Sequence, residues 1–275
     1  QRMRKILVTG SSGYIGRHLL KVLPEYNTVG LDRIFKPQLA DKFIQQDILE
    51  NKLVEGEYDT VVHLAALVNV GDSMKNPMRY YDTNVTGTLK MLEHVDFKHF
   101  VFASTGAAEN PTSPYALSKR VTEDLVRQYC EMNGKSCTIF RFYNVIGSDG
   151  YDPTNMDGLM FNLIKAMKTG EFNVYGDDYD TYDGTPLRDY IHVNEVCHAI
   201  KESLSIHFQY DTIHNLATGS GYSVLQMVDF FKEVNNCDFK VNILPRRPGD
   251  LARSVLGDVS PYMEEKYTIL EKLKI

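Results

Sequence analysis

Tyr115 and Lys119 are the two residues whose types and spacing most clearly allow chemistry. They lie four residues apart in the segment Y-A-L-S-K, so a helix places both side chains on one face, one turn apart. A tyrosine that acts as a base near neutral pH needs its pKa lowered by about three units from about 10, which corresponds to roughly 4 kcal/mol. One cation about 4 Å away at intermediate dielectric supplies that order of energy. Lys119 is such a cation.

Thr105 precedes this pair and completes a candidate catalytic set. We expect Tyr115 to remove the proton from a substrate hydroxyl while Thr105 hydrogen-bonds the same oxygen. A Y-x-x-x-K pair also arises by chance as a surface tyrosine and lysine. Its position behind a predicted strand that ends in a hydroxyl residue favours the catalytic interpretation.

A glycine-rich turn, T-G-S-S-G-Y-I-G, follows the first predicted strand and opens a predicted helix. Glycines at these positions let the backbone approach a pyrophosphate, which the amides and dipole at the helix N-terminus then hold. An ordinary tight turn is the alternative, because turns use glycine freely. The strand-turn-helix context favours a dinucleotide site, with contacts expected from Gly10, Ser12, Gly13, Tyr14, Ile15 and Gly16.

Asp32 ends the second predicted strand, about 20 residues after the turn, as in dinucleotide-binding folds. A carboxylate there accepts the ribose hydroxyls of NAD and repels the 2′-phosphate of NADP, so we expect NAD as the cofactor and hydride acceptor. Arg33 beside it could neutralise a phosphate, which leaves NADP as an alternative. Asp47 and Ile48 follow the third strand and could flank the adenine, or they could simply form a polar strand end.

Elements that alternate in type must position these residues. Short β-branched runs predict buried strands, and segments with apolar residues at helical spacing separate them. The predicted strands are Lys5–Thr9, Thr28–Leu31, Thr60–Leu64, Phe100–Ala103 and Thr138–Phe142, and the predicted helices are Tyr14–Leu23, Pro77–Val95 and Tyr115–Met132. This order predicts an α/β fold, a Rossmann-type doubly wound parallel sheet with a smaller C-terminal substrate-binding lobe.

The periodicity loosens after residue 150. Tyr151–Asp157 and Gly176–Pro186 are rich in Asp, Gly, Tyr and Thr, and we expect loops there that shape a site. We expect residues 1–150 to form mainly the NAD-binding domain and residues 151–275 mainly the second lobe, with some strands and helices returning to the first domain.

Composition excludes several classes of protein. A formal net charge of -6 argues against nucleic-acid and membrane-surface partners, because polyanions would be repelled over most of the surface. The four cysteines show no C-x-x-C pair, so no metal site or disulfide framework is expected. With no apolar signal region after Gln1 and no run of about 18 apolar residues, we expect a cytoplasmic protein.

Beyond the glycine turn and Y-x-x-x-K, four further stretches carry a family likeness. They are H-L-A-A-L from His63, Y-Y-D-T-N-V-T-G-T from Tyr80, Y-G-D-D-Y-D-T-Y-D-G-T-P-L-R-D-Y-I-H-V from Tyr175 and R-R-P-G-D from Arg246. From Lys5 to about residue 258 the chain resembles the extended short-chain dehydrogenase/reductases, and within them the UDP-galactose 4-epimerase group. The resemblance implies NAD-dependent 4-epimerisation of a UDP-hexose through a transient 4-keto sugar, with NAD as the cofactor, and a homodimer formed through Pro77–Val95 and Tyr115–Met132.

The resemblance also implies individual contacts. Leu64, Ala65, Ala66, Asn84, Tyr115, Lys119 and Tyr143 would contact the cofactor, with Asn84 near the phosphates or the active site. Thr105, Asn144, Leu159, Asn173, Tyr175, Arg188, Arg247, Asp250 and Ser254 would contact the UDP-sugar, with the arginines on the pyrophosphate and Asp250 on the uridine ribose. The alternatives are a salt bridge between Arg188 and Asp189, and a solvated basic face at Arg246 and Arg247.

The chain departs from the family pattern in three places. Only nine residues separate Thr105 from Tyr115, where relatives carry a longer loop, so the cover over the sugar is expected to be trimmed. Val68 replaces the usual lysine that contacts the cofactor, which would weaken NAD retention, and the C-terminal region matches little. These departures leave open a nucleotide-binding protein of low activity.

Two residues bear on the reaction and the sugar. Related dehydratases follow the catalytic hydroxyl residue with an acidic pair, whereas Gly106 and Ala107 follow Thr105 here, so epimerisation is favoured over dehydration or reduction. Ser254 lies where galactose-only epimerases carry a tyrosine, so we expect room for an N-acetyl group at C2 and hence UDP-GlcNAc and UDP-GalNAc as substrates. The histidines share no metal spacing and are expected to be structural.

Overall fold

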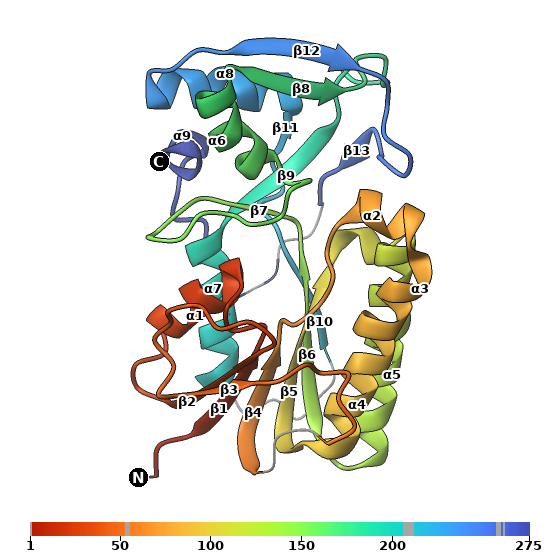
Figure 1. The fold of residues 1–275 in the computed structure, drawn as a ribbon, viewed down its shortest axis with the longest axis vertical. Helices are drawn as coiled ribbons and strands as arrows, with labels where there is room; N and C mark the ends of the chain where they lie inside the picture. The colour runs from red at the N-terminus through yellow and green to blue at the C-terminus, as the bar shows by residue number, and fades with distance from the viewer. Residues whose placement is uncertain (1, 53–55, 206–211, 257–259, 261) are drawn as a thin grey trace.

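A seven-stranded parallel sheet forms the centre of the molecule (Figure 1). The computed structural model describes residues 2–52, 56–205, 212–256, 260 and 262–275. The strand order is β10-β6-β5-β4-β1-β2-β3, and every pair in it is parallel. The strands are β1 (Lys5–Thr9), β2 (Asn27–Asp32), β3 (Lys42–Gln45), β4 (Glu57–His63), β5 (Asp96–Thr105), β6 (Ser136–Phe142) and β10 (Thr212–Leu216).

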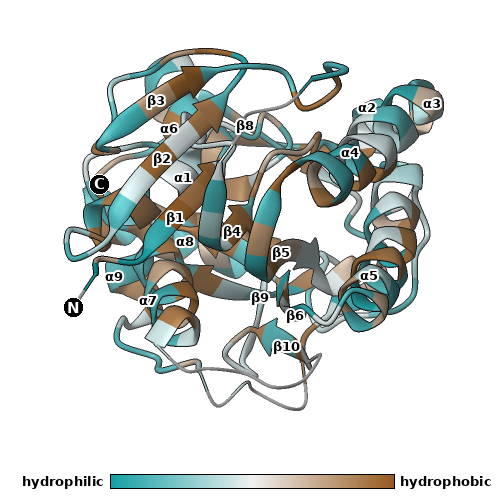
Figure 2. Ribbon diagram, turned by 90° about the horizontal axis from the view of Figure 1, so that it is seen from below, coloured by the Kyte–Doolittle hydropathy of each residue, from teal (hydrophilic) through white to brown (hydrophobic). Residues whose placement is uncertain are grey.

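Helices cover both faces of this sheet, which confirms the predicted doubly wound architecture. One face carries α1 (Tyr14–Lys21) and α7 (Val193–Ser205), and the other carries α2 (Val70–Lys75), α3 (Pro77–Tyr80), α4 (Gly87–His94) and α5 (Pro114–Met132). A short 3-10 turn, η2 (Gly106–Ala108), links β5 to α5. Two separate apolar cores fill the spaces between the sheet and its two helical layers. In the view from below, hydrophobic residues gather on the central strands and on the helix faces that meet them (Figure 2).

The predicted helix Pro77–Val95 contains an interruption. Between α3 and α4, residues Tyr81–Thr86 (η1) adopt a π-helical conformation, in which Asn84 is fully enclosed. An inserted π turn is typical of functional positions in helices, because it rotates one side chain out of the ordinary helical order.

A second lobe lies above the carboxyl ends of the strands (Figure 1). It contains a four-stranded sheet of β7 (Asn144–Ile146), β9 (Leu187–His192), β11 (Gly221–Ser223) and β13 (Arg253–Ser254), and a parallel pair of β8 (Glu171–Tyr175) and β12 (Lys240–Leu244). Helices α6 (Leu159–Thr169), α8 (Val224–Asn235) and α9 (Ile269–Leu273) enclose a third core. The loops expected at 151–157 and 176–186 are present.

The chain crosses between the two lobes more than once. After residue 150 it builds most of the second lobe, yet α7 and β10 return to the first and complete its helical layer and sheet edge. The division at residue 150 therefore stays a prediction. Within the described ranges, no helix has the length and apolar character that spanning a bilayer requires.

Candidate active site

A cavity of about 1890 Å³ lies between the two lobes, at the carboxyl ends of the sheet strands. Parallel α/β sheets bind ligands at this edge, where the strand order reverses on either side of β1. All but one of the predicted site residues line the cavity. Asn84 is the exception, because it is 1% exposed and lies behind the cavity wall.

The glycine turn has the close backbone approach that the sequence predicted. Gly10 has a φ of +66°, and a Cβ there would lie 2.8 Å from the amide nitrogen of Ala65. A Cβ at Gly16 would lie 2.4 Å from the carbonyl oxygen of Gly10. Helix α1 begins directly after Gly13, which offers no side-chain cap, so its first amides face the cavity edge without a capping side chain. A phosphate group suits such a helix start.

Asp32 ends β2 at the same edge. Its carboxylate accepts hydrogen bonds from the backbone nitrogens of Ser12, at 3.1 Å, and of Ile34, at 3.2 Å. These contacts fix the carboxylate at the cavity wall, next to the turn. Arg33 also lines the cavity, so both the negative charge that favours NAD and the positive charge that would favour NADP lie at this edge.

The segment after β4 forms the cavity wall directly beside the turn. Thr9 Oγ1 accepts hydrogen bonds from the backbone nitrogens of Leu64, at 3.1 Å, and Ala65, at 3.2 Å. Asn84 accepts from the Leu67 nitrogen at 2.8 Å and donates to the Leu67 oxygen at 2.9 Å. Asn84 thus braces the wall from behind, a position that its place in the family motif could not reveal.

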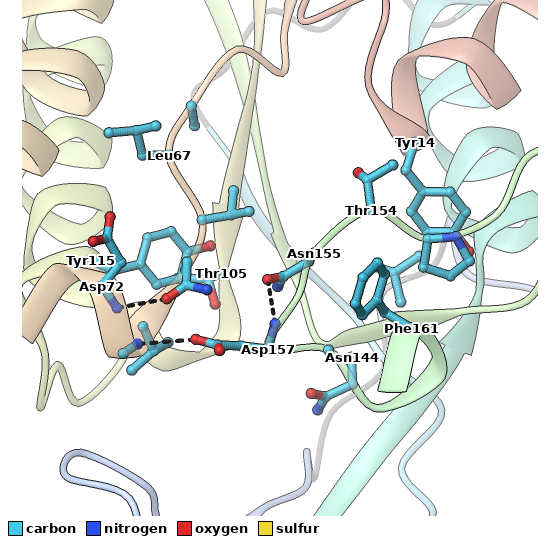
Figure 3. A pocket seen from close by; sticks show the side chains of 18 of the residues that line it. Tyr14, Leu67, Asp72, Thr105, Tyr115, Asn144, Thr154, Asn155, Asp157 and Phe161 are labelled. Atoms are coloured by element: carbon cyan, nitrogen blue, oxygen red, sulfur yellow. Dashed lines mark hydrogen bonds between the residues drawn. The ribbon is translucent and has the colours of Figure 1, made fainter. Parts of the chain in front are cut away.

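The candidate catalytic set comes from β5 and α5. Thr105 is the last residue of β5, and α5 begins at Pro114 with Ser113 as its N-cap. The side chains of Tyr115 and Thr105 lie beside each other on one wall of the cavity (Figure 3). Lys119 is 4% exposed and donates from Nζ to the carbonyl oxygen of Ala103 at 2.8 Å.

Burial dominates the electrostatics of this set in the chain without a cofactor. Burial raises the pKa of Tyr115 to about 12, although the hydrogen bond with Thr105 lowers it. Burial also lowers the pKa of Lys119 to about 7, while the charge of Glu123 raises it. In the chain alone, desolvation is the largest effect on the pKa of each residue. A further positive charge beside Tyr115 is needed to favour the phenolate.

The second lobe contributes a guanidinium without an ionic partner. Arg188 lines the cavity and donates to the carbonyl oxygen of Leu187, and no carboxylate of the described residues lies within ion-pair distance of it. The alternative salt bridge with Asp189 is absent, because Asp189 instead accepts hydrogen bonds from Thr218 and Gly219. An anion in the cavity would supply the missing partner.

Arg247 and Asp250, which the resemblance places on the UDP-sugar, lie next to each other at the cavity wall. Their side chains form an ion pair, with 3.0 Å between Arg247 Nε and Asp250 Oδ2, and both line the cavity. Arg246 pairs with Asp178 at 2.7 Å and stacks on Tyr179, outside the cavity lining. The two neighbouring arginines therefore face different surroundings.

The remaining substrate residues surround the same end of the cavity. Ser254 on β13 is in register with Arg188 on β9, which places the two side by side. Asn144 begins β7, and its side chain donates to the carbonyl oxygen of Asp189 at 3.3 Å. Leu159 begins α6, while Asn173 and Tyr175 lie on β8.

A segment that the sequence marked only as a loop crosses the cavity. We call residues 148–158 the strap. Near one end, Asp149 pairs with Lys21 of α1 at 3.1 Å, and at the other Asp157 accepts a hydrogen bond from the Gly71 nitrogen of α2 at 3.2 Å. Figure 3 shows Asp157 and Asn155 between the wall of Tyr115 and that of Tyr14. In the sequence, only the Asp, Asn and Thr content of this loop indicated that it contributes to a site.

The short segment between Thr105 and Tyr115 also reaches the second lobe. Thr112 Oγ1 donates to the carbonyl oxygen of Gly249 at 3.2 Å. A Cβ at Gly249 would lie within 4 Å of Val70 and Met74. Three segments thus meet at this rim of the cavity, although the linking loop is short.

The histidines have the structural surroundings that we expected. His63 lies between Thr9 and Thr88, at 2.7 Å and 3.0 Å, and burial lowers its pKa to about 3. His192 stacks on Tyr267 with 3.9 Å between ring centres. Among the described residues, no group of three His, Cys, Asp or Glu side chains could hold a metal ion.

Comparisons with known proteins agree with this site. Residues 6–217 match the NAD dependent epimerase/dehydratase family. UDP-glucose 4-epimerase of Pasteurella multocida is 33% identical over 295 residues, which cover 90% of this chain and 87% of that protein. The mouse UDP-glucose 4-epimerase is 30% identical, with 91% and 88% covered.

Solved structures give the same result. The chain is similar to UDP-glucose 4-epimerase from Bifidobacterium longum in complex with NAD+ and UDP, with a TM-score of 0.84, 27% identity and 98% and 96% coverage. It is also similar to the UDP-Glc/GlcNAc 4-epimerase of Campylobacter jejuni, with a TM-score of 0.77, 27% identity and 98% coverage of each. The resemblance that the sequence motifs indicated is confirmed: the chain belongs to the NAD dependent epimerase/dehydratase family.

Proposed function

We propose that this protein is an NAD-dependent UDP-hexose 4-epimerase. The observation that carries the proposal is the continuity of one cavity. It joins the glycine turn and Asp32 at one end, the catalytic set of Thr105, Tyr115 and Lys119 in the middle, and Arg188, which forms no ion pair with a described residue, at the other end. Such a cavity holds a dinucleotide and an anionic sugar nucleotide with the sugar next to the catalytic set. Two relatives that are each 33% identical to this chain carry the name UDP-glucose 4-epimerase.

NAD fits the residues of the first lobe. The space over Gly10 and Gly16, which a Cβ would fill, allows a pyrophosphate to reach the start of α1. Asp32 offers acceptors for ribose hydroxyls and disfavours a 2′-phosphate. When bound, NAD supplies a reversible hydride acceptor and a positive nicotinamide. That positive charge is the one that Tyr115 needs for its pKa to fall from about 12.

The residues of the chain perform the proton transfer. Tyr115 takes the proton of the C4 hydroxyl as the C4 carbon is oxidised, and Thr105 donates a hydrogen bond to the same oxygen. Lys119 provides the cation that favours the phenolate. The 4-keto sugar then presents its other face, and Tyr115 returns the proton to the oxygen as C4 is reduced. No further acid or base is required.

A dehydratase or reductase of the same family is the alternative reaction. Elimination of water needs an acid next to Thr105, but a Cβ at Gly106 would lie 2.6 Å from the ring of Tyr143. Gly106 and Ala107 carry no carboxyl group, and the ring of Tyr143 occupies the space beside Gly106, so the acid that elimination needs is missing at this position. The other alternative, a nucleotide-binding protein of low activity, gives no reason for a buried lysine beneath Tyr115.

Arg188 supports a diphosphate as the part of the substrate held by the second lobe. Its guanidinium lines the cavity, and burial lowers its pKa, so an anion would offset the cost of burying it. A related structure contains UDP with NAD+. Ser254 beside Arg188 supports an N-acetyl group at C2, and the similar Campylobacter jejuni enzyme is named for both UDP-Glc and UDP-GlcNAc.

We further propose a cytoplasmic homodimer. Leu89 on α4 and Leu117 and Val121 on α5 are each about 40% exposed, and two helices with apolar outer faces can pair with those of a second copy. The four cysteines form no disulfide, which suits a reducing compartment.

The test is incubation of the purified protein with NAD and, separately, UDP-glucose, UDP-galactose and their N-acetylated counterparts, with products resolved by NMR. Interconversion at C4 is the expected result. A stable 4-keto product would instead identify a dehydratase, and no change with any sugar would favour the nucleotide-binding alternative.

A further inference from the structure

A buried carboxylate lies one helical turn beyond Lys119 and has no part in the mechanism above. Glu123 of α5 is 0% exposed. Its oxygens accept two hydrogen bonds from Arg141 of β6, at 2.9 Å and 2.7 Å, and one from Ser104 of β5, at 2.5 Å. A charged group is buried at high cost unless it is paired and hydrogen-bonded, so this site is fully specified by its partners.

Three consecutive residues of β5 hold three residues of α5 at successive turns. Thr105 lies beside Tyr115, the carbonyl oxygen of Ala103 accepts from Lys119, and Ser104 donates to Glu123. Because residues four apart on a helix lie on one face, with Cβ atoms about 5–6 Å apart, Glu123 is the neighbour of Lys119 on the side away from Tyr115.

The charged groups around Lys119 come from every element that packs against it. On α5 itself they are Tyr115 and Glu123. From β4 comes His63, whose pKa of about 3 leaves it neutral near pH 7, and from β6 comes Arg141, which is engaged by Glu123. The ring of Phe102 on β5 lies 5.0 Å from Nζ. Among the described residues, Glu123 is the anion that favours the charged form of Lys119.

We propose that Glu123 is a positioning residue for the proposed reaction: fixed by Arg141 and Ser104, its carboxylate keeps the buried Lys119 protonated and aligned beneath Tyr115. This inference rests on the proposed function. With Glu123 present, burial already lowers the pKa of Lys119 to about 7, so loss of the carboxylate lowers it further, and the neutral lysine no longer favours the Tyr115 phenolate.

The decisive experiment is the pH dependence of kcat and kcat/KM for Glu123→Gln, which keeps the shape of the side chain and removes its charge. We expect the alkaline limb of the profile to move to lower pH by about one unit, so that kcat above the limb falls about tenfold. KM for the UDP-sugar should stay within about twofold, because Glu123 does not line the cavity. An unchanged alkaline limb overturns the proposal.

Glu123→Asp keeps the negative charge but moves it away from Lys119 by the length of one methylene group. We expect the alkaline limb to move to lower pH in this variant too, but by less than in the glutamine variant. If the glutamine variant fails to fold, the aspartate variant decides alone: a shifted limb supports the proposal and a wild-type limb overturns it.

Glu195→Gln is the matched control. Glu195 is 2% exposed, accepts from the His192 and Lys266 nitrogens at 2.8 Å and 2.7 Å, and lies 3.6 Å from Lys272. Its loss should lower stability without moving the limb, and a limb that moves equally in this control would reduce Glu123 to a structural ion pair. If the proposed function is wrong, the wild-type protein itself shows no interconversion at C4, which separates the two failures.

Discussion

Lys119 donates a hydrogen bond from Nζ to the carbonyl oxygen of Ala103 at 2.8 Å, which fixes α5 against the end of β5. A Tyr and a Lys four residues apart occur by chance in many sequences. Here this contact holds Tyr115 and Lys119 together at the end of β5, where they can form a catalytic site. One turn earlier on the helix, Tyr115 is brought to Thr105 at the strand end. A buried lysine held by a single carbonyl keeps its charge only with help, and that dependence links the reaction to the groups around it.

Replacing Tyr115 with Phe should reduce turnover by about 10²–10⁴-fold, because the variant removes the proton acceptor and leaves the ring in place. The measurement is the rate of C4 interconversion of UDP-glucose and UDP-galactose by NMR. Tyr129→Phe on the same helix is the control, since Tyr129 packs in the core below and does not line the cavity. Normal turnover of the Tyr115 variant would be incompatible with the proposed role.

Replacing Arg188 with Gln should weaken UDP binding by about 10- to 100-fold, the loss typical of one charge-assisted hydrogen bond. Titration calorimetry with UDP measures it directly. Arg246→Gln is the control, because Arg246 pairs with Asp178 outside the cavity lining. Equal losses in the two variants would argue that Arg188 does not contact the diphosphate.

Replacing Ser254 with Tyr should reduce the conversion of UDP-GlcNAc at least tenfold while conversion of UDP-glucose persists, because the larger side chain would fill the space beside Arg188. The assay compares both substrates on the same preparation. Ser220→Tyr, on an exposed loop, controls for the substitution itself. An unchanged preference would mean that the N-acetyl group lies elsewhere.

Replacing Asp157 with Ala should speed the release of NAD about fivefold, since the strap loses one hydrogen bond to Gly71 worth about 1 kcal/mol. Stopped-flow displacement of bound NADH, followed by its fluorescence, gives the rate. Asp152→Ala is the control. Asp152 lies in the same strap, and its carboxylate accepts a hydrogen bond from Ser148, which also belongs to the strap. If both variants release the cofactor at the wild-type rate, the strap contact does not limit exchange.

The free energy of unfolding should rise with pH between about 3 and 6.5, in part through His63. Its folded pKa of about 3 lies below the ordinary value of 6.5, so the unfolded chain binds the proton first and acid favours unfolding. The contribution is at most on the order of 5 kcal/mol, and His99 and His192, with folded pKa values of about 4, act with the same sign. Urea unfolding of the wild type and of His63→Gln at a series of pH values measures the contribution of His63 to the free energy of unfolding.

The glutamine variant should show a shallower rise of stability with pH across this range, because position 63 no longer titrates. His94→Gln, at an exposed position on α4, should leave the slope unchanged. A wild-type slope in the His63 variant would show that other groups carry the acid sensitivity.

The sequence by itself determined the features that depend on neighbouring residues. Alternating β-branched and helical segments predicted the doubly wound sheet, since period and turn chemistry are local properties. The glycine turn, Asp32 at a strand end and the four-residue spacing of Tyr115 and Lys119 were readable for the same reason. The resemblance of the longer motifs to one family then supplied the second lobe and its substrate residues.

Only the tertiary structure decided which distant groups meet. The contact of Asp157 with Gly71 and that of Thr112 with Gly249 join segments far apart in the chain and depend on how the two lobes fold together, and the bracing role of Asn84 depends on how η1 packs against the segment after β4. The directions in which the pKa values of Tyr115 and Lys119 shift also depend on the tertiary structure, because all the atoms packed around a group determine its desolvation. Glu123 had no sequence signal for the same physical reason: its partners Arg141 and Ser104 come from two other strands, and no spacing along the chain brings them together.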